Sequence, residues 1–214
     1  PGRVDLTGKD FGVFRYKDNG SDVEIALPRR ERSTGAGHQD FDVQADHTMP
    51  VEEDLYRRDF TPNAMAVDLS SGRLIDPFGG AADIDAGEFR TLNEQSLSDD
   101  PLRTLRGLVL HGRYGLRPDE ATRLQMGTHS HRLPHIPSER VQAELDKLFA
   151  SNNPAAAIRL AHETGALDHI LHEVNSAFGY DQNNPHHEHE LGEHLVRVLD
   201  RVAQKSDDKD PRLA

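Results

Sequence analysis

The apolar residues change their spacing near residue 98, and this change limits the folds that the chain can adopt. Residues 11–16 and 23–27 alternate between apolar and polar types, which is typical of β-strands, and residues 18–20 between them predict a hairpin turn. From residue 102 onward, apolar residues recur every three or four positions, which predicts amphipathic helices. We therefore expect an α+β chain, with strands and short helices to about residue 97 and helices after it.

Breakers and capping residues divide both parts into elements. Asp99 or Asp100 can cap the first long helix, with Pro101 in its first turn, and the buried stripe of that helix is expected at Leu102, Leu105, Leu108 and Val109. Further helices are expected at about 118–127, 137–150, 153–164, 166–173 and 186–205, the last amphipathic through Leu191, Leu195, Val198 and Val202. In the N-terminal part we expect a long irregular loop over 29–50, a short helix leading into a strand over 52–67, and a hairpin over 68–75.

The composition describes a polar but foldable protein. Its 214 residues include 35% apolar residues and no Cys, so neither a disulfide framework nor a Cys-based zinc site is expected. No apolar run approaches the length of a membrane span, and we expect no membrane partner and a cytoplasmic location. The oligomeric state is not predicted by any of these features.

The charge is unevenly distributed along an acidic chain. The net charge of −12 disfavours a general nucleic-acid coat protein, because phosphate binding usually needs a basic face. Residues 51–100, however, hold four basic against twelve acidic side chains, whereas residues 101–150 hold eight basic against five acidic. This pattern suits an enzyme that binds metal and RNA side by side, but ordinary variation on a solvated surface explains it about as well.

Two segments carry side chains that suit nucleotide chemistry. Arg57-Arg58-Asp59 places two guanidinium groups beside a carboxylate, which suits triphosphate and ribose oxygens, although a surface ion pair is an equally good interpretation. On a helix, the acceptor Asp100 and the donors Arg103 and Arg106 share one face, which could present a base-pairing-like edge to a nucleotide. The alternative there is a helix cap with an i,i+3 salt bridge.

Several segments stand out in consistent order along the chain: VEIALPRRERSTGAGHQDF, DLYRRDFTPNAMAVDL, LIDPFGG, DDPLRTLR and PSERVQAELDKLFASNNPAAAIRLAHETGALDHIL. Together they resemble the class II tRNA nucleotidyltransferases, which are CCA-adding enzymes, and the bacterial poly(A) polymerases of the same family. The resemblance implies a partial nucleotidyltransferase head with a mixed β-sheet and helices, then an all-α neck, then the start of an HD-like helical domain. The expected boundaries are 1–97, 98–175 and 176–214.

The same resemblance implies roles for individual residues. Arg58 and Asp59 would hold the sugar and phosphates of the incoming nucleotide, Asp100 and Arg103 would recognise its base, and Arg106 would be a further nucleotide-binding residue. Glu24 matches a third carboxylate of the family's catalytic site, where a carboxylate can orient or deprotonate the attacking RNA hydroxyl.

Departures from the family pattern concern the metals and two positions in the motifs. The glycine-rich GGxVRD stretch and the Asp-x-Asp pair that hold Mg²⁺ are expected upstream of Pro1. Val109 replaces a frequent arginine, and Pro62 replaces an apolar residue.

The His-rich segment QNNPHHEHELGEHLVRVLD resembles the start of an HD phosphohydrolase-type domain. His194 matches the first metal ligand of that domain, so a complete HD domain would hold a divalent metal. The other histidines, among them His186, His187 and His189, are as well explained without a metal.

The function implied is metal-dependent transfer of nucleotides from CTP and ATP to the 3′ end of tRNA. The alternatives are poly(A) addition by the same head, a non-catalytic RNA-binding fragment, and an HD phosphohydrolase with a vestigial head.

Residues 1–214 alone are expected to add no nucleotide to tRNA at any Mg²⁺ concentration, because the two metal-binding carboxylates of the family motif have no match in the sequence. Incubation with labelled CTP or ATP measures this directly. Robust incorporation would assign the metal to another carboxylate pair, such as Asp22 with Glu24.

Overall fold

The computed structural model describes residues 3–7, 13–18, 20–33, 41–180 and 190–205. The chain forms two compact units. We call residues 1–58 with 63–77 the N-terminal unit, and residues 59–62 with 78–214 the helical unit.

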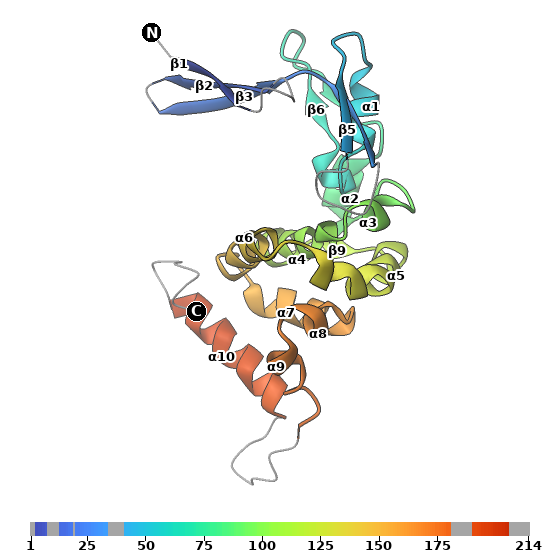
Figure 1. Cartoon of the computed structure of the whole chain (residues 1–214). Coiled ribbons are helices and arrows are strands. Elements are labelled where there is room, and N and C mark those ends of the chain that lie inside the picture. The colour runs from blue at the N-terminus through green and yellow to red at the C-terminus, as the bar shows by residue number, and fades with distance from the viewer. Residues whose placement is uncertain (1–2, 8–12, 19, 34–40, 181–189, 206–214) are drawn as a thin grey trace. The chain divides into compact units, whose positions relative to one another are not determined.

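The N-terminal unit begins with an antiparallel sheet in the order β1 (Arg3–Thr7), β2 (Val13–Asp18) and β3 (Ser21–Ala26) (Figure 1). Strands β2 and β3 form the expected hairpin, with Asp18 paired to Ser21. Gly20 in the turn has a φ of 98°, a left-handed conformation that glycine adopts without steric cost. The alternating pattern therefore predicted this hairpin correctly.

A second antiparallel pair, β4 (Arg29–Ser33) and β5 (Phe41–Ala45), corrects the expected loop over 29–50. The pair is held by backbone hydrogen bonds, which any residue except proline can donate. The polar and glycine-rich composition of this segment predicted a loop because it carries no apolar alternation that would indicate strands.

Helix α1 (Val51–Tyr56) and the two-residue strands β6 (Ala66–Val67) and β7 (Leu74–Ile75) complete the N-terminal unit. Strands β6 and β7 are antiparallel, which confirms the predicted hairpin over 68–75. In its turn the Asp68 carboxylate accepts hydrogen bonds from the Ser70 hydroxyl and backbone, which lower the pKa of Asp68 to about 2.

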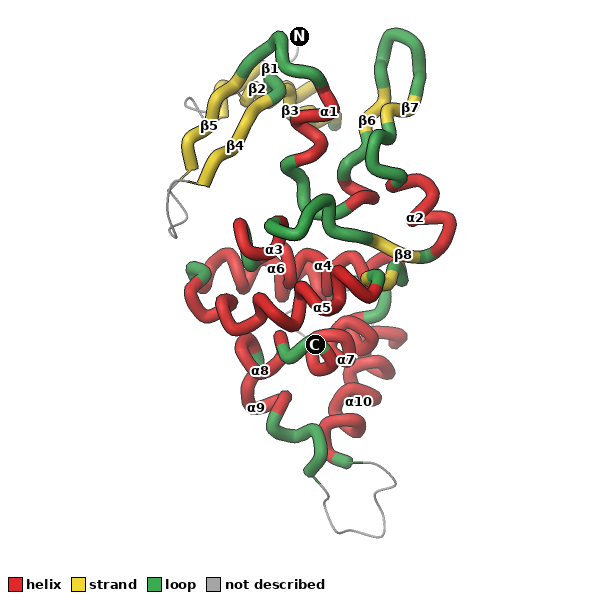
Figure 2. The backbone as a smooth tube through the Cα atoms, turned by 90° about the vertical axis from the view of Figure 1, so that its right-hand side faces the viewer, coloured by secondary structure: helices red, strands yellow, loops and turns green. Residues whose placement is uncertain are grey.

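The helical unit is a stack of short helices with one small parallel strand pair (Figure 2). The expected helical segments are present with two corrections: the helix expected over 166–173 is divided into Ala166–Ile170 and His172–Asn175, and the last helix begins at Leu191 rather than near residue 186. Its elements are α2 (Gly80–Ala86), β8 (Glu88–Phe89), α3 (Ser96–Asp99), α4 (Leu102–Tyr114), β9 (Arg117–Pro118), α5 (Glu120–His129), η2 (Ser130–His135), α6 (Ser138–Phe149), α7 (Pro154–Glu163), α8 (Ala166–Ile170), α9 (His172–Asn175) and α10 (Leu191–Lys205).

Helix α4 lies at the centre of this unit and packs against both α6 and α7. Its stripe of Leu102, Leu105 and Leu108 is buried as predicted. The rings of Phe60 and Phe89 meet edge to face, with centroids 4.8 Å apart, in the same apolar cluster. This core orients the polar side of α4.

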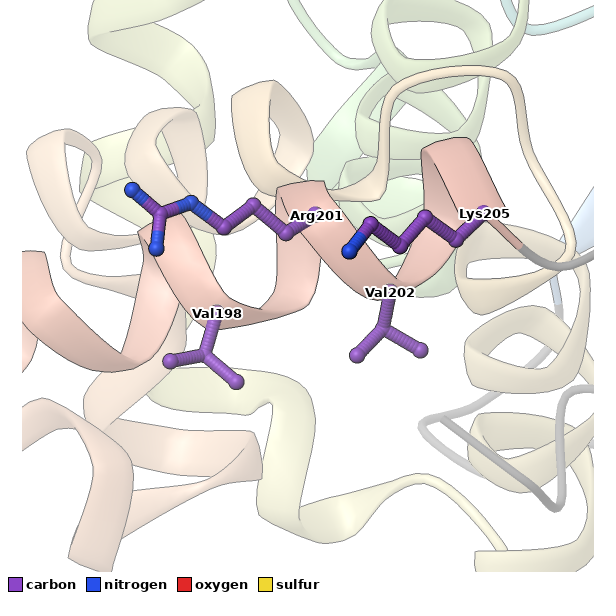
Figure 3. A pocket seen from close by; sticks show the side chains of 4 residues that line it. All are labelled: Val198, Arg201, Val202 and Lys205. Carbon is purple, nitrogen blue, oxygen red and sulfur yellow. The ribbon is translucent and has the colours of Figure 1, made fainter.

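Helix α10 buries a different side from the one expected. Gly192 and Val196 are buried, and α10 packs against α7, whereas Val198 and Val202 are exposed. Figure 3 shows these two valines projecting from α10 beside the long side chains of Arg201 and Lys205. The apolar spacing predicted the helix correctly but assigned the wrong face to the core, because both faces of α10 carry apolar residues. No described helix combines the length and apolar composition that crossing a lipid bilayer requires.

The close approach of α10 to Phe178 yields a stability prediction. A Cβ atom at Gly192 would lie 2.6 Å from Phe178 Cγ and 2.7 Å from Phe178 Cα, so Gly192→Ala forces the backbone apart. We expect it to lower the free energy of unfolding by about 1–3 kcal/mol, as overpacking does. Urea denaturation followed by circular dichroism measures the change.

Gly127→Ala is the matched control, because a Cβ there meets only Thr164 O at 3.5 Å. The added methyl group raises helix propensity by up to about 1 kcal/mol, so this variant should be as stable as the parent or more stable. Equal stability of Gly192→Ala and the parent would show that α10 docks on Phe178 more loosely than the structure indicates.

Candidate functional site

Asp100 lies in the junction between α3 and α4, where the backbone is extended. The N-cap position of α4 is Pro101 rather than Asp99 or Asp100, but Asp100 Oδ1 accepts a hydrogen bond from Leu102 N, the first residue of the helix, at 3.2 Å. Its Oδ2 accepts one from Arg140 Nη2 of α6 at 3.1 Å. The side chain keeps 25% of its surface exposed, so part of the carboxylate faces solvent.

Arg103, one turn into α4, is held by the helix that precedes it. Its Nη1 donates to the Ser96 hydroxyl at 2.8 Å and to the Ser96 carbonyl at 3.2 Å. Burial lowers the pKa of the Arg103 guanidinium, and the negative charges of Asp100 and Asp59 oppose this shift. The guanidinium remains protonated, since arginine does not lose its proton in proteins. Asp100 and Arg103 thus offer an acceptor and a donor from one short segment.

Asp59 and Arg106 form an ion pair in the same unit. Arg106 Nε lies 2.8 Å from Asp59 Oδ2, and Phe60 N donates to Asp59 Oδ1 at 2.9 Å. The Asp59 side chain is only 2% exposed, whereas that of Arg106 is 47% exposed. Ser96 donates to the Asp59 carbonyl, which links this pair to the partner of Arg103.

A hydrogen-bond network supports the segment that follows Asp59. The Thr61 hydroxyl donates to the Asp83 carboxylate, and Arg90 Nε donates to both Asp83 oxygens at 3.0 Å. The hydrogen bond to Asp83 raises the pKa of Arg90. Pro62 lies in the short 3₁₀ turn η1 (Thr61–Asn63), a conformation that suits its fixed φ.

Arg58 and Glu24 belong to the N-terminal unit, whereas the residues above belong to the helical unit. Arg58 Nη1 donates to the Asn63 carbonyl at 3.0 Å, and Arg58 Nη2 lies 3.5 Å from Asp54 Oδ2. Glu24 is exposed on β3 opposite Arg15. The surface ion pair considered for the paired arginines is therefore present at Arg58, which leaves its binding role as a prediction.

The proposed metal ligand His194 is exposed on α10. His186, His187 and His189 lie outside the described residues. In the described part of the chain, no three His, Asp or Glu side chains come together in a way that could hold a metal ion. The ligand role of His194 in a complete HD domain stays a prediction.

The structure adds side chains that the sequence motifs did not indicate. Arg140 and Ser96 are two of these, and Arg132 of η2 is a third, because its guanidinium donates to the Ser98 carbonyl. Three arginines from different elements, Arg103, Arg132 and Arg140, therefore hold α3 and the residue after it. Arg140 lies within PSERVQAELDK, a segment whose sequence predicts only a helical neck. Its partner is 40 residues away, so neither local spacing nor helix geometry could have identified the contact.

Comparison with known families shows two matches along the chain. Residues 2–90 match the family described as "Poly A polymerase head domain". Residues 115–178 match the family described as "Probable RNA and SrmB- binding site of polymerase A".

Curated relatives include the Multifunctional CCA protein of Xanthomonas campestris pv. campestris, which is 38% identical over 92% of this chain and 49% of its own length. That of Teredinibacter turnerae is 36% identical over 97% of this chain and 51% of its own length. The chain thus spans about half the length of the curated relatives it matches.

Solved structures with the same fold include the Bacillus stearothermophilus CCA-adding enzyme in complex with CTP, at a TM-score of 0.72 and 26% identity. The match covers 98% of this chain and 54% of that one. A tRNA-processing enzyme with CTP matches at a TM-score of 0.67 and 26% identity, over 86% of this chain and 45% of that one.

The buried carboxylate of Asp59 yields a second stability prediction. Arg106→Met keeps the aliphatic stem but removes the guanidinium beside Asp59, so we expect a loss of about 1–3 kcal/mol in the free energy of unfolding. Arg113→Met on the exposed side of the same helix is the control and should change stability by less than about 0.5 kcal/mol. Urea denaturation of both variants compares them.

Adding Asp59→Asn to Arg106→Met removes the carboxylate charge that Arg106 faces and keeps the oxygen that accepts from Phe60 N. The double variant should therefore be at least as stable as Arg106→Met alone. Fully additive losses would mean that the charge of Asp59 is not what Arg106 compensates.

Proposed function

Because the chain belongs to the family of CCA-adding tRNA nucleotidyltransferases and poly(A) polymerases, we propose that the protein transfers nucleotides from CTP and ATP to the 3′ end of tRNA without a template. The arrangement of Asp100 and Arg103 at the start of α4 is the observation that carries this proposal. An acceptor and a donor held on one short segment can substitute for a template base.

Hydrogen-bond chemistry favours C and A at this pair. A carboxylate accepts from an exocyclic amino group, and a guanidinium donates to a ring nitrogen or a carbonyl. C and A both present an amino donor beside a ring acceptor, whereas U and G present a carbonyl at the position of the amino group. Asp100 is partly exposed and uses one contact on each oxygen, so acceptor capacity remains for a base.

The contacts to sugar and phosphate are proposed for Arg58 and Arg106, because guanidinium groups suit phosphate oxygens and both side chains are about half exposed. Asp59 is too buried to reach a ligand in this conformation. We assign it the role of holding Arg106 in place.

Phosphoryl transfer of this class uses divalent metal, and we propose Mg²⁺ for the full-length enzyme. The described residues of this chain do not form such a site. Glu24 is proposed as the carboxylate that orients the attacking hydroxyl.

RNA binding is proposed for the helical unit, within the segment that matches the probable RNA-binding family. Arg117, Arg123 and Arg159 line a hollow on this unit. Arg123 pairs with Glu120 and Arg159 with Glu193, so Arg117 is the proposed phosphate contact. Neither CTP, ATP nor tRNA requires a membrane, and a cytoplasmic location is proposed.

A second candidate function is poly(A) addition, which the match to a poly A polymerase head domain favours. The sequence of the product separates the two. A tRNA lacking its terminal CCA should gain C, C and A when CTP and ATP are both supplied, whereas a poly(A) polymerase adds a run of A and ignores CTP.

The base-reading role predicts a specific change in nucleotide choice in the full-length enzyme. Asp100→Ala and Arg103→Ala should each lower the preference for CTP over UTP by about ten- to a hundredfold, since each removes one half of a bidentate contact. Arg58→Ala should weaken all four nucleotides alike, because phosphate and ribose are common to them. The measurement is kcat/KM for each nucleoside triphosphate.

Equal losses for all four nucleotides in Asp100→Ala and Arg103→Ala, with the CTP/UTP ratio unchanged, would contradict base reading. The contacts to Leu102 N and Ser96 would then be only structural.

A further inference from the structure

We propose that Arg140 is a positioning residue that holds the Asp100 carboxylate in the orientation needed for base selection. This inference rests on the proposed function, since it assigns Arg140 a role through Asp100. Neither family match nor the sequence motifs assigns Arg140 a role.

The geometry fixes the Asp100 carboxylate at both oxygens. The amide of Leu102 approaches Oδ1 and the guanidinium of Arg140 approaches Oδ2, at 3.2 and 3.1 Å. A carboxylate bound at one oxygen can still turn about its χ2 angle, whereas contacts at both oxygens from different directions hold its plane. Two contacts leave about two of its four acceptor positions for a ligand.

The cation that pairs with Asp100 among the described residues is Arg140. Arg103, which stands three residues after Asp100, donates instead to both oxygens of Ser96. Arg140 thus contacts the acceptor Asp100, and Ser96 contacts the donor Arg103.

Arg140 also keeps Asp100 from neutralising Arg103. Burial lowers the pKa of Arg103, and the nearby charge of Asp100 partly opposes this shift; a spacing of three residues also favours a direct salt bridge. Without Arg140, the carboxylate is free to turn toward Arg103. In such a salt bridge the Asp100 carboxylate and the Arg103 guanidinium would bind each other, and neither would be available to recognise a base.

The support for Arg140 comes from the packing of α6 on α4. Arg140 lies in the first turn of α6, and its neighbour Val141 packs against the apolar core. The Arg140 side chain is 31% exposed, so its ion pair with Asp100 lies at the edge of the core. A nucleotide can therefore approach the Asp100 carboxylate from solvent.

The experiment measures kcat/KM for CTP and for UTP in the full-length enzyme and its Arg140→Ala, Arg140→Lys and Asp100→Ala variants. The CTP/UTP ratio comes from one preparation of each variant, so it does not depend on the fraction of protein that is folded. Arg140→Ala should lower the ratio on the order of tenfold, and Arg140→Lys should retain part of it because one charged donor remains. The Asp100→Ala/Arg140→Ala double variant should have the ratio of Asp100→Ala alone.

Lys147→Ala is the matched control. Lys147 lies on the same helix and forms a comparable ion pair with Glu144, Nζ to Oε1 at 2.7 Å, away from Asp100. It should leave the CTP/UTP ratio unchanged.

An unchanged ratio in Arg140→Ala, together with a reduced ratio in Asp100→Ala, would overturn the role of Arg140 and leave the proposed function standing. Additive losses in the double variant would also overturn it, because Arg140 would then act independently of Asp100. A full-length enzyme that uses UTP as well as CTP before any substitution would instead contradict the proposed function itself.

Discussion

The burial of one side of α4 is the constraint on which the helical unit depends. Leu102, Leu105 and Leu108 leave water together, and the removal of apolar surface is the main favourable term in folding. Helices α6 and α7 and the rings of Phe60 and Phe89 supply the surfaces that cover this stripe. Because helix geometry ties the two sides of α4 together, the buried leucines also determine where Arg103 and Arg106 project.

Around that core, each important charged group has its own partner from another element. Asp59 holds Arg106, Ser96 holds Arg103, and Arg140 holds Asp100. Such contacts are stronger in a partly dehydrated setting than on the open surface, where ion pairs contribute little. In a chain with a net charge of −12, carboxylates thus orient some of the cations, as Asp59 does for Arg106.

Local patterns predicted most of the helices and strands. The hairpin of β2 and β3 followed from alternation, and α4 followed from its leucines. The pairing of β4 with β5 was missed because backbone hydrogen bonds leave little trace in a polar segment. The buried face of α10 was assigned wrongly, since its apolar residues occupy more than one side and only the position of Phe178 and α7 selects among them.

The sequence by itself determined the type and order of the helices, the buried stripe of α4, and the close spacing of Asp100, Arg103 and Arg106. These properties depend on interactions within about four residues, which helix geometry makes predictable. The tertiary structure decided which partners these side chains have. Arg140 reaches Asp100 across 40 residues only because α6 packs on α4, and Asp59 is buried only because Phe60 enters the same core.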